Sequence, residues 1–458
     1  MSVQYGNLRR WSFGYPARHW LLRAAVVLAA MTIAYPVLAQ PPAPATIDLK
    51  LAQEYFAEME SLSNADAGRL WGVRLYGPMM FVDPSTHQAV ANQADKEGRL
   101  HAQNGVFGGQ LPPEMPIANT EMDWSGVRWT MVMWPLAQNR RPRKQLMAHE
   151  SFHRLQPELG LTPLDNNNNH LDGRIGRTWL QLEWRALTKA LATTGEARRQ
   201  AISDALYFRA LRRALIPNAA TNENRLETNE GIAEYTGVKL SARYAEEARL
   251  VAEVTLWNGP NRSPFVRSFA YVSGPAYGVL LDESRMAWRK KLKPDSDLGE
   301  LLRAAYRITI SAPTEAEAVT RSRKYDGDEV IAHEKVHETQ RQKIIAEQRS
   351  RLIEGPVLVL PLGPNVNYGF DPDEVTAIDE QSSVFGGDVQ VTDDWGVLKS
   401  TGGVLIVREN GKLVRVQVPA PENPTVTSIT GSGWALDLKP GWKLVSGPRA
   451  HDWTVQKQ

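Results

Sequence analysis

The sequence of 458 residues contains no cysteine. This absence excludes a disulfide scaffold, thiol catalysis and metal sites with cysteine ligands, so any metal must be held by His, Asp, Glu or backbone oxygen. An excess of one charge is also lacking, because 53 Lys and Arg face 51 Asp and Glu. This balance gives no case for nucleic acid as the main partner. With 42% hydrophobic residues, the chain has the composition of a globular protein of roughly two to four domains.

Long apolar runs are absent after the N-terminus. Residues 1–39 contain four arginines and no acidic residue, and end in AAVVLAAMTIAYPVLA. This run is shorter than the ~20 residues that span a bilayer, and Pro36 interrupts it. Val37 and Ala39 fit the positions before a signal-peptidase cut, which predicts a cleaved signal peptide and a periplasmic or secreted protein without a stable membrane span. An uncleaved anchor is the alternative. Loss of the four arginines would change the net charge from +2 to −2.

The pattern of hydrophobic and polar residues in the remaining sequence changes twice. Residues 40–140 contain a linker, a helix-like segment and short strand-like runs, whereas 141–352 show amphipathic helical patterns. Residues 353–458 return to strand patterns with turn signals such as Asn410-Gly411. The sequence therefore predicts an α+β protein with a small mixed N-terminal region, a mainly helical middle domain and a C-terminal β-sandwich-like domain.

The helical region opens with HESFH, in which His149, Glu150 and His153 form an HExxH pattern. Residues four apart lie one turn apart on one helix face, so both imidazoles can bind one zinc ion. Glu150 is then placed to act as the general base that takes a proton from a water molecule at the metal. A zinc site needs a third protein ligand. The candidates are Glu183 and Glu230.

The segment LETNEGIAEYTG resembles the second zinc helix of the gluzincin metallopeptidases, the clan of thermolysin and aminopeptidase N. The resemblance implies that Glu230 is the third ligand and that Glu234, one turn later, hydrogen-bonds a zinc-binding histidine. Glu183 lies in the apolar helical pattern WLQLEWRAL, where a carboxylate should be paired with Arg185 or another nearby arginine. We favour Glu230 because the pair with Glu234 supplies both carboxylates. The implied cofactor is one Zn²⁺ per chain in a zincin-like helical domain.

The segment AYVSGPAYGVLL resembles the part of aminopeptidase N-like enzymes that carries a catalytic tyrosine. In those enzymes the phenol stabilises the oxyanion of the tetrahedral intermediate. Tyr271 is the matching residue, and Tyr277 is a second candidate. The alternative is that Tyr271 is a packed core residue.

The resemblance implies a peptide or protein substrate. The interval from His153 to Glu230 is much longer than in thermolysin, and the GxMEN segment that grips a free amino terminus is not present. An endopeptidase is therefore favoured over an aminopeptidase. The run GVRWTMVMWPL, before the zinc helix, is predicted to be an edge strand that pairs with an extended peptide. A cell-wall or modified peptide is also compatible. The competing hypothesis is a non-catalytic exported binding protein with a degenerate zinc site and a ligand-binding β-domain.

Two other groups of possible metal ligands are present. A second HExxH sequence, HEKVH, occupies residues 333–337 and is followed by a charged run that is typical of a solvated helix. We expect these two histidines to be incidental. His170 follows a run of asparagines and is predicted to be a loop histidine, with Asp165 and Asp172 as weak candidates for calcium binding.

Overall fold

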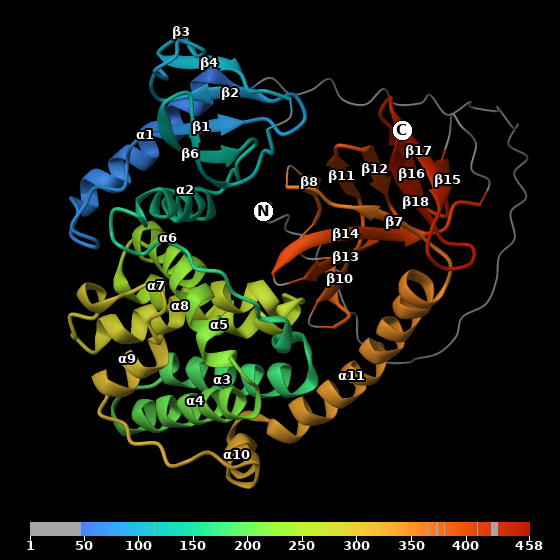
Figure 1. Cartoon of the computed structure of the whole chain (residues 1–458). Coiled ribbons are helices and arrows are strands. Elements are labelled where there is room, and N and C mark those ends of the chain that lie inside the picture. The colour runs from blue at the N-terminus through green and yellow to red at the C-terminus, as the bar shows by residue number, and fades with distance from the viewer. Residues whose placement is uncertain are drawn as a thin grey trace, which may run out of the picture.

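The computed structural model describes residues 47–458, except 114, 365, 372, 373, 380, 410 and 423–428. The predicted signal peptide, residues 1–39, lies outside the described residues. Helices and sheets are both prominent, so the predicted α+β class is confirmed. Figure 1 shows a sheet beside helix α1, a large group of helices, and a second group of sheets that the long helix α11 connects to the helices.

The N-terminal part is a six-stranded sheet with order β3-β4-β2-β1-β6-β5, packed against α1. Asp48 starts α1 because its side chain accepts hydrogen bonds from the backbone N–H groups of Lys50 and Leu51. Phe56 of α1 stacks on Phe81 of β1 with 4.4 Å between ring centroids. The elements are α1 (Leu49–Asp66), β1 (Met79–Val82), β2 (Gln88–Ala91), β3 (His101–Gln103), β4 (Val106–Gln110), β5 (Thr120–Trp124) and β6 (Val127–Met133).

The strand in front of the zinc motif is an inner strand, so the prediction of an edge strand in GVRWTMVMWPL is wrong. β6 pairs in parallel with β1 and antiparallel with β5. The free edge at this end of the sheet belongs to β5. The burial of most of β6 explains the order, since a strand covered on both faces needs neighbours. The more polar sequence of β5, TEMDW, tolerates the edge.

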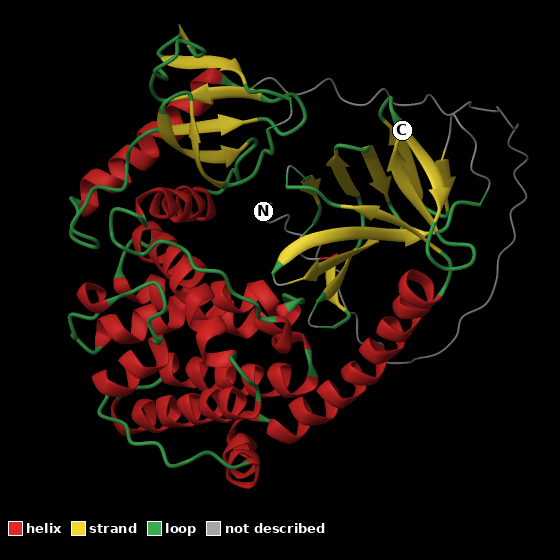
Figure 2. Cartoon of the chain, viewed as in Figure 1, coloured by secondary structure: helices red, strands yellow, loops and turns green. Residues whose placement is uncertain are grey.

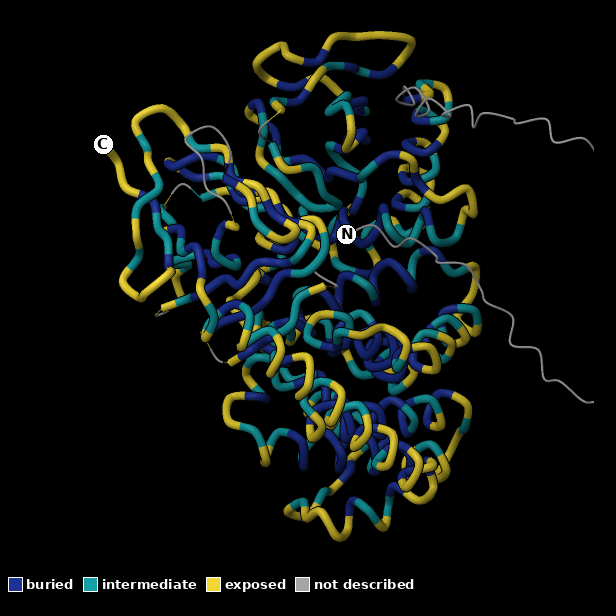
Figure 3. The backbone as a smooth tube through the Cα atoms, turned by 90° about the vertical axis from the view of Figure 1, so that its right-hand side faces the viewer, coloured by how far each residue is buried: buried dark blue, intermediate teal, exposed yellow. Residues whose placement is uncertain are grey.

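The helical part surrounds one large hydrophobic cluster with members from α3, α4, α6 and α8. Figure 2 shows this part as almost entirely helical, and in Figure 3 the tube turns from exposed to buried where helices face one another. No helix in the described parts of the chain is long and apolar enough to cross a membrane. The helices are α2 (Arg140–Leu155), η1 (Asn169–Asp172), α3 (Arg174–Ala192), α4 (Gly195–Leu215), α5 (Ala219–Leu226), η2 (Glu227–Gly231), α6 (Ile232–Ser241), α7 (Ala245–Asn258), η3 (Gly259–Asn261), α8 (Phe265–Glu283), η4 (Arg289–Lys291), α9 (Leu298–Ala305), α10 (Glu315–Ser322), η5 (Arg323–Tyr325), α11 (Gly327–Arg349) and η6 (Ser350–Glu354).

Glycines let the η2–α6 segment touch α2 and α8 at backbone distance. A Cβ atom on Gly237 would lie 2.6 Å from the carbonyl oxygen of Gln145 in α2. A Cβ atom on Gly274 in α8 would lie 2.2 Å from the carbonyl oxygen of Gly231. Real Cβ atoms do not approach backbone so closely, so only glycine allows these two crossings. The crossings bring together the three segments that carry HExxH, NEGIAE and AYVSG.

The C-terminal part contains a seven-stranded sheet, ordered β17-β18-β7-β14-β13-β10-β9, and a five-stranded sheet, ordered β15-β16-β12-β11-β8. Apolar residues of both sheets form one hydrophobic cluster. β13 and β14 form a hairpin in which Gly411 has a φ of 79°, while Asn410 lies outside the described residues. The strands are β7 (Val357–Pro361), β8 (Asn367–Gly369), β9 (Val375–Ala377), β10 (Ser382–Phe385), β11 (Val389–Asp393), β12 (Gly396–Ser400), β13 (Val404–Glu409), β14 (Lys412–Pro419), β15 (Ile429–Gly431), β16 (Trp434–Leu438), β17 (Trp442–Ser446) and β18 (Trp453–Lys457).

Substitution Gly274→Ala should strongly destabilise the protein, because the added methyl group meets the backbone of Gly231 rather than a flexible side chain. Overpacking costs of this kind are about 1–3 kcal/mol, and we expect the upper end of that range. Urea unfolding of the variant and the wild type measures the difference. Gly369→Ala is the matched control, since nothing lies within 4 Å of its Cβ position. Equal destabilisation by both substitutions would contradict the close crossing.

Candidate metal centre

Helix α2 carries the HExxH residues and is fixed by two hydrophobic cores. Met147 and Ala148 belong to the core beneath the N-terminal sheet, whereas Phe152 belongs to the core of the helical part. The side chains of His149 and His153 are almost fully buried, with exposed fractions of 5% and 10%. The helix is thus held rigidly, which allows its polar side chains to keep a defined geometry.

Three possible ligand atoms converge although they come from distant parts of the sequence. The Nε2 atoms of His149 and His153 lie 3.0 Å apart. Glu230 Oε2 lies 3.5 Å from His149 Nε2 and 3.3 Å from His153 Nε2. Ligands of a tetrahedral zinc ion, with bonds of about 2.0–2.1 Å, lie about 3.3 Å from one another. The two imidazoles and the carboxylate therefore fit a zinc ion in both chemistry and spacing.

Glu230 reaches the histidines from a π-helical turn. This turn, η2, spans Glu227–Gly231 and continues directly into α6. Single π-helical turns insert an extra residue into a helix and are frequent at functional sites. The turn brings the Glu230 carboxylate to α2 while α6 keeps its close crossing with the same helix.

Glu234 orients His149, in the role that the resemblance implies. Its Oε2 lies 2.8 Å from His149 Nδ1, and its Oε1 accepts a hydrogen bond of 2.7 Å from Gln145 Nε2. An ionised carboxylate only accepts, so His149 Nδ1 donates to Glu234, and Nε2 is the nitrogen that faces the candidate metal position and can bind a metal once it loses its proton. Burial opposes a charge on His149, but Glu230 and Glu234 outweigh it and raise its pKa to about 10. The carboxylates thus favour positive charge at these nitrogens, which is the charge that Zn²⁺ supplies.

Glu150 is buried beside the two histidines without a fixed partner. Together with His149 and His153 it offers ligand atoms within 4.8 Å of one another, so it is the competing carboxylate ligand. Within the described part of the chain, no hydrogen bond or ion pair holds its carboxylate. Burial raises the pKa of Glu150 despite the neighbouring histidines. A base needs free oxygens and a pKa nearer neutrality, whereas Glu230 Oε2 already lies beside both Nε2 atoms, so Glu230 is the better candidate for a ligand and Glu150 for a base.

Tyr271 lies in the site, whereas Tyr277 does not contact it. The phenol of Tyr271 donates a hydrogen bond to Glu230 Oε2, and its ring stacks on His149 with 5.5 Å between centroids. Burial and the Glu230 charge raise the pKa of Tyr271 well above its usual value, so the phenol remains a neutral donor. Tyr277 instead donates to Glu183 Oε1 at 2.6 Å.

Two residues of the site were missed by the sequence analysis. Arg267 Nη2 lies 2.9 Å from Glu230 Oε1 and so holds the other oxygen of that carboxylate. Its signal was available, because Arg267 precedes Tyr271 by one helical turn and shares its face of α8. Gln156, at the end of α2, contacts His153 Nδ1 through its Oε1 at 2.7 Å. Only its position one turn after His153 pointed to it.

Glu183, the competing third ligand, belongs to a separate ionic network. It is fully buried, and its carboxylate lies 2.7 Å from Arg212 Nη1 and 3.3 Å from Arg209 Nη1. The expectation of pairing with an arginine is confirmed, and of the two alternatives it is another arginine rather than Arg185. Arg185 pairs with Asp326 on the surface.

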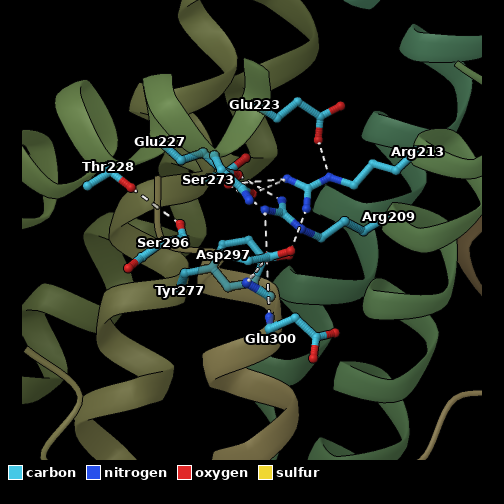
Figure 4. Close-up of polar contacts among 12 residues, drawn as sticks. Arg209, Arg213, Glu223, Glu227, Thr228, Ser273, Tyr277, Ser296, Asp297 and Glu300 are labelled. Carbon is cyan, nitrogen blue, oxygen red and sulfur yellow. Dashed lines mark hydrogen bonds and ion pairs between the residues drawn. The ribbon is translucent and has the colours of Figure 1, made fainter. Parts of the chain in front are cut away.

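This ionic network also holds the π-helical turn η2 in place, from the side of α4. Arg209 of α4 forms two hydrogen bonds with Glu227, the first residue of η2, one of them 2.8 Å long. Figure 4 shows Arg209 and Arg213 lying between Glu227 and Asp297. Because each buried charge is paired, the position of the turn that carries Glu230 is tied to α4.

The second HExxH sequence has a different environment. His333 is exposed, as expected, with 72% of its side chain accessible. The expectation of a wholly solvated helix is wrong at Glu334, which is fully buried. Its carboxylate pairs with Arg177 at 2.7 Å and accepts a hydrogen bond from Gln181 at 2.6 Å. These two residues of α3 satisfy the buried charge and hold α11 against the helical part.

Among the residues that the structure describes, Asp165 and Asp172 do not belong to a group of possible metal ligands. His170 Nε2 lies 3.0 Å from Glu223 Oε1, so this histidine is tied to the ionic network rather than free in a loop. The Asp172 carboxylate accepts a hydrogen bond of 2.8 Å from the backbone N–H of Phe265, at the start of α8. The Asp165 carbonyl accepts one from Arg225.

Substitution of Glu183 should mainly lower stability, whereas substitution of Glu230 should mainly lower zinc binding. Glu183→Gln removes the charge that compensates two buried arginines, so it should lower the free energy of unfolding by about 3–5 kcal/mol while the folded protein still binds zinc. Glu230→Gln should reduce zinc binding with a smaller effect on unfolding. Urea unfolding and metal content after dialysis measure both. Loss of zinc in folded Glu183→Gln, with zinc retained in Glu230→Gln, would refute our choice of ligand.

Comparison with known proteins adds no relative to this description. No family model matches the chain, and neither a curated protein nor a solved structure matches it.

Proposed function

We propose that this protein is an exported zinc-dependent metallopeptidase of gluzincin type, in which His149, His153 and Glu230 hold one Zn²⁺. The observation that carries the proposal is the convergence of the two Nε2 atoms and Glu230 Oε2 at 3.0–3.5 Å. The contacts of Glu234 with His149 and of Tyr271 with Glu230 also support the proposal. Export rests on the signal-peptide pattern of residues 1–39.

Glu150 is the proposed general base. Bound zinc would polarise the scissile carbonyl and make a nearby water molecule more acidic. Glu150 takes the proton of that water and delivers it to the leaving amine. Its burial favours this role, because a raised pKa brings the carboxyl closer to the range in which a group both accepts and returns a proton.

Tyr271 is the proposed donor to the oxyanion. Its phenol lies on the same side as Glu230 and stacks on His149, so it is close to the reacting atoms. A neutral donor at this position, once it gives up its hydrogen bond to Glu230 Oε2, lowers the cost of forming negative charge on the carbonyl oxygen. Arg267, one turn earlier on α8, keeps Glu230 Oε1 occupied and leaves Oε2 directed at the histidines.

An endopeptidase is supported by the position of β5. This edge strand lies next to α2, so a peptide that adds to it as a further strand would run along the zinc helix. We also infer that the two C-terminal sheets, which share one core, form a sandwich-like accessory domain.

Substitution Glu150→Gln should preserve zinc and abolish hydrolysis, since the amide cannot take a proton. The expected fall in turnover is at least about 10²-fold. Metal analysis and mass spectrometry of a digested protein library measure the two properties, with the exposed Glu158→Gln as control. Retained turnover in Glu150→Gln would refute the mechanism. Wild-type protein that binds zinc but cleaves nothing would favour the non-catalytic binding protein.

Tyr271→Phe should lower kcat by about 10²–10³-fold with little change in KM, because the phenol acts mainly in the transition state. Tyr277→Phe is the matched control. It removes a hydrogen bond to buried Glu183, so it should cost about 1–3 kcal/mol of stability and leave kcat unchanged. Steady-state kinetics and urea unfolding test both variants. The role of Tyr271 would be refuted if its substitution changed stability alone.

A further inference from the structure

Gln156 connects the two segments that carry the candidate zinc ligands. It is the C-cap residue of α2 and is only 1% exposed. Its side-chain Oε1 lies 2.7 Å from His153 Nδ1, and its Nε2 donates a hydrogen bond of 3.2 Å to the backbone carbonyl of Asn229. Asn229 is the residue before Glu230. A single amide therefore spans the gap between the second histidine and the turn of the third ligand.

The direction of these hydrogen bonds follows from the chemistry of the groups. The Asn229 carbonyl only accepts, so the NH₂ group of the Gln156 amide must face it. The amide oxygen is then turned towards His153, and because it too only accepts, His153 Nδ1 must carry a proton. In a neutral imidazole this leaves the lone pair on Nε2, the atom that lies 3.3 Å from Glu230 Oε2.

We propose that Gln156 is a positioning residue of the metal centre, which fixes the tautomer of His153 and the distance between His153 and the Glu230 turn. This role rests on the proposed zinc site. The two histidines would then have different supports, since a carboxylate backs His149 and a neutral amide backs His153. Of these two groups, only the amide can accept a hydrogen bond from an imidazole and donate one to a backbone carbonyl at the same time.

Two substitutions separate the two parts of this role. Gln156→Met removes both hydrogen bonds at similar side-chain volume. Gln156→Glu keeps an acceptor for His153 but places a carboxylate against the Asn229 carbonyl, so only the bridge is lost. Gln138→Met is the control, because Gln138 is exposed just before the same helix. Circular dichroism checks that each variant is folded, and Gln156→Glu carries the test if Gln156→Met does not fold.

The first readout is the Kd for Zn²⁺, measured by competition with a chromophoric chelator in the full-length protein. Loss of an outer partner of a metal ligand weakens binding by about 10–100-fold, and we expect this for Gln156→Met. Gln156→Glu should fall between Gln156→Met and wild type, and Gln138→Met should equal wild type. Wild-type affinity in both Gln156 variants would overturn the proposal while leaving the zinc site intact. Failure of the wild type to bind zinc would instead overturn the proposed function, and the positioning role with it.

The second readout is the protonation of His153, which activity does not report. With ¹⁵N-labelled histidine and bound Zn²⁺, the wild type should show a slowly exchanging Nδ1–H signal that disappears in His153→Ala. Gln156→Met should lose or broaden this signal, and Gln156→Glu should keep it. An unchanged signal in Gln156→Met would show that another group fixes the tautomer and would overturn the assignment.

Discussion

The candidate metal centre depends on backbone contact between three helical segments. η2–α6 meets α2 at Gly237 and α8 at Gly274, where no side chain larger than hydrogen fits. Across these two crossings, Glu230 of η2 and Tyr271 of α8 lie beside the histidines of α2. The glycines thus allow residues that are far apart in the sequence to gather around the histidines of α2.

This contact brings many charges into a low-dielectric interior, and the structure pairs them in two ways. On the side of the π-helical turn that faces α4, arginines of α4 neutralise Glu183, Glu223 and Glu227. On the side that faces α2, Glu230 and Glu234 contact His149. Arginine stays charged and forms a permanent partner, whereas imidazole can exchange its proton for a metal ion. The first group therefore acts as a support, whereas the second keeps histidines that can exchange protons for a metal ion.

Local patterns predicted the helices, the α+β class and the residues with a fixed spacing on one helix face, such as His149 and His153. They could not predict the inner position of β6, because strand order depends on long-range pairing rather than on the strand itself. Arg267 and Gln156 were missed because their roles depend on where another segment lies. Which arginine pairs with Glu183 could not be decided for a related reason. Arg185 is close in sequence, but it lies on the outer side of α3 and pairs with Asp326.

The two HExxH sequences show why a motif needs its surroundings. In α2, Glu150 has no fixed partner in the described part of the chain. The carboxylate of Glu230, from η2, approaches the Nε2 atoms of both histidines. In α11, the corresponding Glu334 is held by Arg177 and Gln181 of α3, while His333 points into solvent. Identical spacing thus yields a candidate metal centre in one helix and a docking ion pair in the other. The difference lies in the charge of the opposing segment: the carboxylate of Glu230 approaches both histidines of α2, whereas Arg177 opposite α11 pairs with Glu334.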